Sequence, residues 1–162
     1  MSNVLLSVRD LRTWFHTDQG IAKAVDGVSF DVMEGETLGI VGESGCGKTV
    51  TSLSVLGLLP QPPAEVMESS SILFEGEELV GATEARLRAL RGNEISMIFQ
   101  EPMSSLNPVF SVGNQIAESL RLHRGMGRKA ARVEAGRLLT EVGISEAERR
   151  LDQYPHQLSG GM

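Results

Sequence analysis

The sequence predicts an α/β fold, and three observations along the 162-residue chain support this prediction. Residues 4–15 and 24–32 alternate apolar and polar side chains, as half-buried strands do. A glycine-rich segment at residues 42–49 lies between a short apolar run and a segment with helical spacing of apolar residues. The second half of the chain has helical periodicity. We therefore expect an N-terminal antiparallel β-layer, a strand-loop-helix unit and a helical part, in this order.

Turn-forming residues separate the predicted strands. A turn around residues 18–20 joins the first two strands, and a second turn at residues 34–36 leads into residues 37–41, which have the sequence TLGIV. This short apolar run is of strand type. Residues 71–74 and 95–99 are also predicted to be strands.

Helical spacing predicts the remaining elements. Apolar residues recur at helical intervals over residues 50–59, and the prolines at positions 60, 62 and 63 are expected to end this helix because proline lacks the N–H that a helix interior needs. A short helix over residues 83–91 has Thr83 as a plausible N-cap.

The helical second half is predicted to contain two longer helices. They cover residues 112–123 and 129–142, and the glycines within residues 125–127 separate them. One further turn or two are expected over residues 146–151.

Residues 42–49 have the sequence GESGCGKT, which fits the phosphate-loop pattern G-x-x-x-x-G-K-[ST] with Gly42, Gly47, Lys48 and Thr49 at its fixed positions. The alternative is a glycine-rich turn that binds nothing, but a strand before the loop and a helix after it are the context that the pattern requires. The sequence therefore predicts a cradle for nucleotide phosphates.

The chemistry of phosphate binding explains each residue type at the fixed positions of this loop. Glycines allow several backbone N–H groups to converge on one anion. Lys48 supplies a mobile positive charge for the β- and γ-phosphates, the Thr49 hydroxyl is predicted to bind Mg²⁺, and the following helix directs its positive end at the phosphates. The predicted contacts to nucleotide in this loop are Gly42, Glu43, Ser44, Gly45, Cys46, Gly47, Lys48, Thr49 and Val50.

Composition narrows the class of protein. A net charge of −6 argues against a nucleic-acid-binding surface, and the basic cluster at residues 121–137 is interrupted by glutamates, as on a solvated helix face. The single cysteine, Cys46, suits a reducing compartment. It is either a reactive thiol of lowered pKa beside the helix start or a small residue at a variable position. The sequence contains no run of 18 apolar residues and no leader-like start, so we expect a chain that neither spans a membrane nor is exported.

Two further motifs are similar to sequences of a known protein family. Residues 158–162 read LSGGM and residues 99–102 read FQEP. Together with the phosphate loop, and over essentially the whole chain, they resemble the ATP-binding subunits of ABC transporters. The first motif is similar to the signature sequence of that family and the second to its glutamine loop. The resemblance implies a P-loop NTPase fold of ABC-ATPase type, with residues 1–100 as β-layer and phosphate-loop core and residues 101–162 as helical subdomain.

The resemblance also implies roles for individual residues, with ATP and Mg²⁺ as cofactors. Ser159, Gly160 and Gly161 match residues that bind the γ-phosphate held by a second ATP-binding subunit, so the active unit is a head-to-tail dimer, of identical or different subunits. Gln100 matches a residue that touches Mg²⁺ and the attacking water, and Lys48 and Gln100 are the predicted catalytic residues. Phe15 is the best-placed match to an aromatic residue that stacks on adenine. Trp14 competes with it, and either ring could instead pack into the β-layer.

Within this family, three segments resemble the oligopeptide, dipeptide and nickel permease branch. They are residues 39–45, 100–108 and 154–162. Members of this branch energise bacterial importers, so the resemblance implies transmembrane permease subunits as partners and a peripheral location at the cytoplasmic face of the inner membrane. Peptide, nickel, opine or another small solute remains open as the transported substrate. No nucleic acid is expected as a partner.

The sequence ends at Met162, beside the signature motif, and lacks the aspartate, glutamate and histidine that follow this motif in the family. Because phosphoryl transfer depends on positioning and charge stabilisation, we expect this chain alone to bind nucleotide without efficient hydrolysis. In the family the missing segment is also a central strand beside the strand before the phosphate loop, so we expect uncovered apolar surface and marginal stability or aggregation. The favoured interpretation is part of an importer ATPase. The alternatives are a non-hydrolysing nucleotide-binding remnant and a soluble ABC-type ATPase that acts on nucleic acid.

Overall fold

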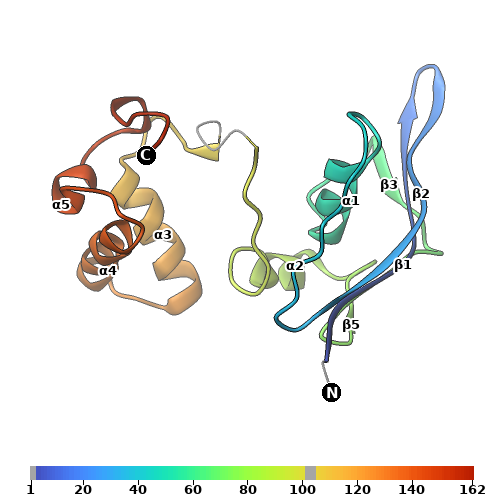
Figure 1. Cartoon of the computed structure of the whole chain (residues 1–162), viewed down its shortest axis with the longest axis horizontal. Coiled ribbons are helices and arrows are strands. Elements are labelled where there is room, and N and C mark those ends of the chain that lie inside the picture. Colours follow the sequence, from blue (N-terminus) through green and yellow to red (C-terminus); the bar gives the residue numbers. More distant parts are fainter. Residues whose placement is uncertain (1–2, 101–104) are drawn as a thin grey trace. The chain divides into compact units, whose positions relative to one another are not determined.

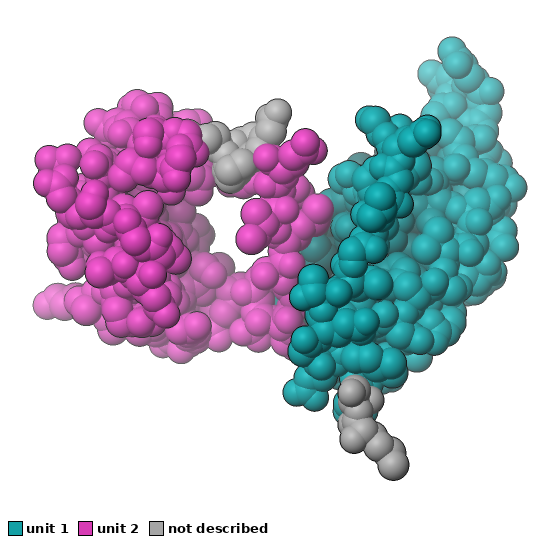
Figure 2. Space-filling model, viewed as in Figure 1, with its two compact units in different colours: residues 1–91 teal, residues 92–162 magenta. Residues whose placement is uncertain are grey.

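The computed structural model describes residues 3–100 and 105–162, and the chain forms two compact units, residues 1–91 and 92–162 (Figure 2). The first unit contains the β-layer and the phosphate-loop segment. The second is helical. The division at residues 100 and 101 that the sequence suggests stays a prediction.

The first unit is built on a five-stranded sheet in which every pair of strands is antiparallel (Figure 1). The sheet order is β2-β1-β4-β5, and β3 pairs with another stretch of β1. The predicted strands β1, β2 and β4 are present, whereas β3 and β5 were not predicted. The strands are β1 (Val4–Thr17), β2 (Gly20–Met33), β3 (Ala64–Val66), β4 (Ser71–Phe74) and β5 (Glu77–Glu78).

A bulge in β1 changes the simple alternation that the sequence suggests. The pairing of β1 with β2 shifts register between Val8 and Leu11, and Asp10 within the shift has φ 43°. Val8 and Leu11 are three residues apart, yet both are fully buried. An extra residue in one strand explains this burial because it moves the following side chain to the other face.

Helix α1 (Lys48–Val55) packs on β1 through a buried pair of hydroxyls. The Oγ atoms of Thr13 and Ser54 are 2.8 Å apart, and the two residues are 0% and 4% exposed. Because Ser54 donates its only hydroxyl proton to the Val50 carbonyl at 2.8 Å, Thr13 must be the donor in the pair. The contact therefore satisfies both buried hydroxyl donors.

The prediction that α1 covers residues 50–59 is wrong at both ends. The helix stops at Val55, and Gly57 with φ 59° ends it in the left-handed conformation, so the prolines lie beyond a helix that has already ended. Arg91 binds the free carbonyls at this end, with Nε donating to Leu56 O at 2.8 Å and Nη2 donating to Gly57 O.

Two predicted strands are absent from the structure. Residues 37–41 and 95–99 have no strand conformation, and Val41 and Ile98 are 95% and 92% exposed. A strand needs a neighbouring strand to receive its backbone hydrogen bonds. No described segment pairs with residues 37–41 or 96–99, and Ile95 forms only an isolated bridge. The apolar pattern of these residues alone therefore does not produce a strand.

Helix α2 (Glu84–Leu90) confirms the predicted short helix and its cap. Thr83 has an extended backbone, and its Oγ1 accepts a hydrogen bond from Arg86 N at 3.3 Å. Leu90 is fully buried. The cap and this buried side chain explain why seven residues suffice for a stable element.

The second unit contains the predicted helices with small changes of boundary. Its core is formed by Leu120, Ala131, Ala135 and Leu151, of which the last three are fully buried. Gly125, with φ 63°, follows the first of the two long helices, as expected for a C-terminal cap. The elements are α3 (Val112–Arg124), α4 (Arg128–Glu141), α5 (Ala147–Arg150) and the 3₁₀ helix η2 (Pro155–Gln157).

Two helical glycines allow close packing in this unit. A Cβ added to Gly113 would lie 2.7 Å from the Leu151 carbonyl oxygen and 2.9 Å from Leu151 Cβ. A Cβ on Gly136 would lie 2.9 Å from Glu148 Oε1, which is the end of a flexible side chain. Only the contact at Gly113 involves a backbone atom, which cannot move aside as the Glu148 side chain can.

Among the helices in the part of the chain that the structure describes, none is long and apolar enough to cross a lipid bilayer.

The buried hydroxyl pair makes an asymmetric prediction. Ser54→Ala leaves the buried Thr13 hydroxyl without an acceptor and should lower the free energy of unfolding by about 1–3 kcal/mol. Thr13→Val keeps the bond from Ser54 to Val50 and should cost less than about 1 kcal/mol. Urea denaturation of both variants measures the difference. Equal losses, or a larger loss in Thr13→Val, would contradict the assigned donor.

Gly113→Ala and Gly136→Ala form a matched pair in the second unit. Gly113→Ala should destabilise the chain by about 1–3 kcal/mol because its methyl group meets backbone. Gly136→Ala should be neutral or stabilise by up to about 1 kcal/mol, since alanine favours helix and the Glu148 side chain can move. Thermal unfolding followed by circular dichroism compares them. A loss in Gly136→Ala as large as that in Gly113→Ala would argue against this packing.

Candidate functional site

The predicted phosphate loop connects residues 37–41 to the start of α1. Within it, the Lys48 ammonium group donates to the carbonyl oxygens of Gly42 and Glu43, both at 2.7 Å. Cys46 N also donates to the Glu43 carbonyl, at 3.3 Å. The lysine charge is thus held over the loop by backbone acceptors, and a phosphate could replace these acceptors as its partner.

Close approach to strand β2 requires glycine at position 47. Gly47 has φ 93°, and a Cβ there would lie 2.4 Å from the Ala24 carbonyl oxygen. At Gly42 a Cβ would lie 2.5 Å from Cys46 Sγ, whereas at Gly45, with φ 81°, it would meet nothing within 4 Å. Gly47 is therefore needed both for space and for conformation, Gly45 is needed for conformation, and at Gly42 the added Cβ meets only the side chain of Cys46. The pattern alone does not reveal this difference.

The N-terminus of α1 offers hydrogen-bond donors to a ligand. Its first internal bond is from Thr51 N to Gly47 O at 2.8 Å, so the N–H groups of Lys48, Thr49 and Val50 have no acceptor within the helix. No other described residue accepts from them, and Gly47 as N-cap provides no side-chain cap. An anion is the ligand that such a helix start favours.

Thr49 differs from the other hydroxyl residues of α1. Thr51, Ser52 and Ser54 each donate to the carbonyl four residues earlier in the chain, at 3.0, 3.3 and 2.8 Å. No hydrogen bond involves the Thr49 hydroxyl among the described residues, and Thr49 is exposed. A free hydroxyl oxygen at this place fits a ligand of Mg²⁺. In the described part of the chain, no three His, Cys, Asp or Glu side chains form a metal site.

Cys46 is an exposed free thiol, with Sγ 3.5 Å from Lys48 Nζ. Both interpretations of this residue, a reactive thiol and a filler at a variable position, stay open.

The two candidate aromatic residues lie next to each other on β1. Phe15 is half-buried and pairs with Ala22 on β2 and Ala64 on β3. The Trp14 ring lies under the Lys23 ammonium group, 4.6 Å from the ring centroid. Trp14 therefore already has a cation on its face, and adenine stacking by Phe15 stays a prediction.

The remaining predicted site residues belong to the second unit. Gln100 is exposed, and its neighbours Glu101, Pro102, Met103 and Ser104 lie outside the described residues. Ser159, Gly160 and Gly161 form an exposed turn in which Met162 N donates to Ser159 O at 2.9 Å. The structure brings together residues 42–49, and the roles of Gln100 and of this turn stay predictions.

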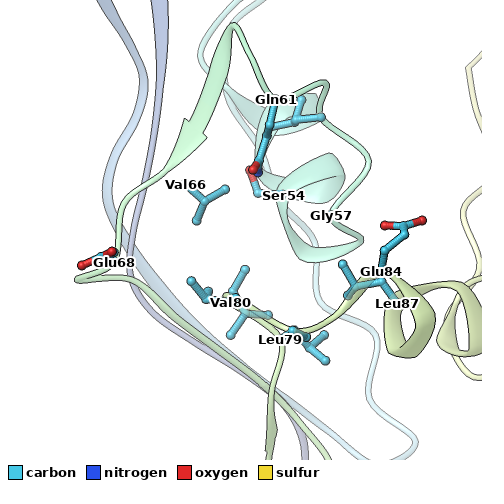
Figure 3. A pocket seen from close by; sticks show the side chains of 13 residues that line it. Ser54, Gly57, Gln61, Val66, Glu68, Leu79, Val80, Glu84 and Leu87 are labelled. Carbon is cyan, nitrogen blue, oxygen red and sulfur yellow. The ribbon is translucent and has the colours of Figure 1, made fainter.

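A cavity of about 500 Å³ lies at the other end of α1 (Figure 3). Ser54 and Gly57 line it together with Leu79 and with Leu87 of α2. Its lining contains no residue of the phosphate loop. This cavity is therefore not the predicted nucleotide site.

Comparison with known proteins identifies the family. The family model described as ABC transporter matches residues 25–162. The chain therefore belongs to the ABC transporter family, and the resemblance inferred from the phosphate loop and the signature is confirmed.

Curated relatives match nearly the whole chain. The dipeptide transport ATP-binding protein DppD of Bacillus subtilis is 51% identical over 158 residues, which cover 98% of this chain and 47% of the relative. The oligopeptide transport ATP-binding protein AppD of the same organism is 49% identical over 160 residues, covering 99% of this chain and 48% of the relative. The chain spans about half the length of these relatives.

Solved structures support the fold. A dimeric structure of the ATP-binding cassette MJ0796 bound to ADP and Pi has a TM-score of 0.81 at 23% identity, with 96% of this chain and 64% of that chain covered. The structure of cbiO1 from Clostridium perfringens has a TM-score of 0.69, also at 23% identity, with 98% of this chain and 57% of that chain covered. These neighbours confirm the predicted ABC-ATPase fold class.

The contact between Gly47 and Ala24 gives a test of the loop geometry. Gly47→Ala should lower the free energy of unfolding by about 2–5 kcal/mol, because it combines a left-handed alanine with a clash against backbone. Gly45→Ala meets no atom and should cost only the conformational term, about 1–2 kcal/mol. Urea denaturation measures both. The loop geometry would be refuted by equal stability of the two variants.

Proposed function

We propose that this chain is the ATP-binding part of an importer subunit, in which ATP binding and hydrolysis by the complete protein drive uptake of a solute, with peptide favoured. One observation carries the proposal: the ammonium group of Lys48 contacts the phosphate loop, and three N–H groups at the start of α1, directly after the loop, have no acceptor among the described residues. The names of the relatives, which are dipeptide and oligopeptide transport ATP-binding proteins, support the substrate class.

In this proposal the loop binds the triphosphate of ATP. The N–H groups of residues 48–50 donate to phosphate oxygens, and Lys48 exchanges its two carbonyl acceptors for the β- and γ-phosphates. Phe15 stacks on adenine. Because the Lys48 charge is already held above the loop, little reorganisation is needed when the anion binds.

Mg²⁺ would neutralise charge on the β- and γ-phosphates. Thr49 and Gln100 are its proposed protein ligands, and the free Thr49 hydroxyl supports the first of them. Gln100 would also orient the water that attacks the γ-phosphate. Ser159, Gly160 and Gly161 would donate to the γ-phosphate held by a second subunit, which makes a head-to-tail dimer the proposed assembly.

The proposed partners follow from this role. They are transmembrane permease subunits and a second ATP-binding subunit, and the proposed location is the cytoplasmic face of the bacterial inner membrane. The dimeric state named for one structural neighbour is consistent with such a pair. Hydrolysis is proposed for the complete protein, since the chain spans about half the length of its relatives.

Lys48→Ala tests the proposal. Removal of a charge-assisted contact to phosphate should weaken ATP binding by about 1.5–3 kcal/mol, roughly a 10- to 150-fold increase in Kd. Titration of the purified chain with a fluorescent ATP analogue in the presence of Mg²⁺ measures this change.

Lys129→Ala is the matched control. Lys129 is exposed on α4 and forms no ion pair with any described residue, so its loss removes the same charge at another place. This variant should bind the analogue as the unchanged chain does. Undiminished affinity in Lys48→Ala would show that the loop is not the nucleotide site.

A further inference from the structure

The chain that leads into the predicted signature motif is closed by the side chain of one glutamine. Gln157 ends the 3₁₀ helix η2, directly before residues 158–162. Its backbone N–H donates to the Tyr154 carbonyl at 2.9 Å, and its Oε1 accepts from Tyr154 N at 2.9 Å. Gln157 therefore binds both backbone polar groups of Tyr154. We call this pair of hydrogen bonds the Tyr154–Gln157 closure.

The side-chain bond matters because η2 has few bonds of its own. Besides the bond from Gln157 N, Leu158 N closes a turn of this helix by donating to the Pro155 carbonyl at 3.1 Å. Pro155, at the first helical position, has no N–H to contribute. Short 3₁₀ turns also have poor hydrogen-bond geometry. The bond to Gln157 Oε1 therefore adds substantially to the bonds that define this element.

The chain before the closure is anchored to the start of α3. The Leu151 carbonyl accepts from Gly113 N and the Gln153 carbonyl accepts from Val112 N, both at 2.9 Å. Leu151 is fully buried, and Pro155 is buried as well. The backbone up to η2 therefore has a fixed place in the helical unit.

The motif after the closure has no such anchor within the part of the chain that the structure describes. Ser159, Gly160 and Gly161 are exposed, and a Cβ added to either glycine would meet no atom within 4 Å. The bond from Met162 N to Ser159 O lies within the turn itself. Among the described residues, the direction of this turn is therefore set through η2.

Two exposed rings lie beside the closure. The ring centroids of Tyr154 and His156 are 5.8 Å apart, with 12° between the ring planes. This stack is a second contact within η2 and the residue before it. It does not involve the backbone N–H of Tyr154, so the two contacts can be removed one at a time.

We propose that Gln157 is a positioning residue for the signature motif. Its side-chain oxygen closes η2, and η2 sets the direction in which residues 159–161 face the γ-phosphate held by a second subunit. The second statement rests on the proposed function, whereas the closure does not. Only Oε1 is used, and Nε2 has no partner among the described residues. A glutamate oxygen can accept the same bond, so glutamate should replace Gln157 whereas an apolar residue should not.

Amide hydrogen exchange of the full chain without nucleotide, followed by NMR, tests the closure. Gln157→Leu removes the acceptor, and the Tyr154 amide should exchange about tenfold faster. Gln157→Glu keeps an acceptor and should leave this rate within about twofold of the unchanged chain. Gln153→Leu is the matched control. The Gln153 side chain accepts from Arg150 Nη1 and not from a backbone N–H, so the Tyr154 rate should stay the same.

The same variants separate positioning from nucleotide binding in the complete protein. A fluorescent ATP analogue, at protein concentrations too low for association, measures binding to the phosphate loop of the first unit, and its Kd should be the same in Gln157→Leu. Sedimentation with a non-hydrolysable ATP analogue measures association of two subunits. This association should weaken about tenfold in Gln157→Leu and not in Gln157→Glu. A general loss of folding would change both readouts.

An unchanged Tyr154 exchange rate in Gln157→Leu, or an equal rise in Gln157→Glu, would overturn the closure. A rise of the same size in His156→Ala would do so as well, because it would assign the hold on η2 to the ring stack. Normal association of Gln157→Leu would overturn the positioning role alone. Absence of nucleotide-dependent association in the unchanged protein would overturn this role together with the head-to-tail dimer of the proposed function.

Discussion

The contact of α1 with the β1–β2 hairpin is the constraint on which the phosphate loop depends. Gly47 passes so close to the Ala24 carbonyl that no side chain fits, and seven residues later Ser54 joins β1 through the hydroxyl of Thr13. One contact holds the first turn of the helix and the other holds its last turn. The direction of α1, and with it the direction of its free N–H groups, is therefore set by the hairpin and not by the loop.

Strand β1 is central to the sheet, because it pairs with β2, with β4 and with β3. Along one edge β1 pairs with β2, and along the other it pairs with β4 through residues 6–9 and with β3 through residues 13–15. The register shift around Asp10 lies between these regions and keeps both Val8 and Leu11 buried. The same strand also contains Thr13 and Phe15, so any change in its register would alter both the packing of α1 and the candidate adenine contact.

The sequence predicts well those elements that local chemistry decides. The hairpin of β1 and β2, the Thr83 cap of α2 and the glycine break between α3 and α4 all follow from signals within a few residues. The strand predictions for residues 37–41 and 95–99 are wrong because a strand forms only with a partner strand, which is distant in the sequence and is not part of any local pattern. The residues of the phosphate loop were predictable from their spacing. The contacts of Ala24, Thr13 and Arg91 with the loop and with α1 could not be predicted, because they join segments far apart in the sequence.

The predicted phosphate loop lies in a chain whose net charge is −6. In the proposed function the loop binds through backbone N–H groups and one lysine, whose donors lie in fixed directions and add little net charge. Such donors act at short range, so the acidic surface repels an approaching anion but does not weaken the bound state to the same degree. The proposed nucleotide site therefore depends on short-range donors in fixed directions and not on the overall charge of the chain.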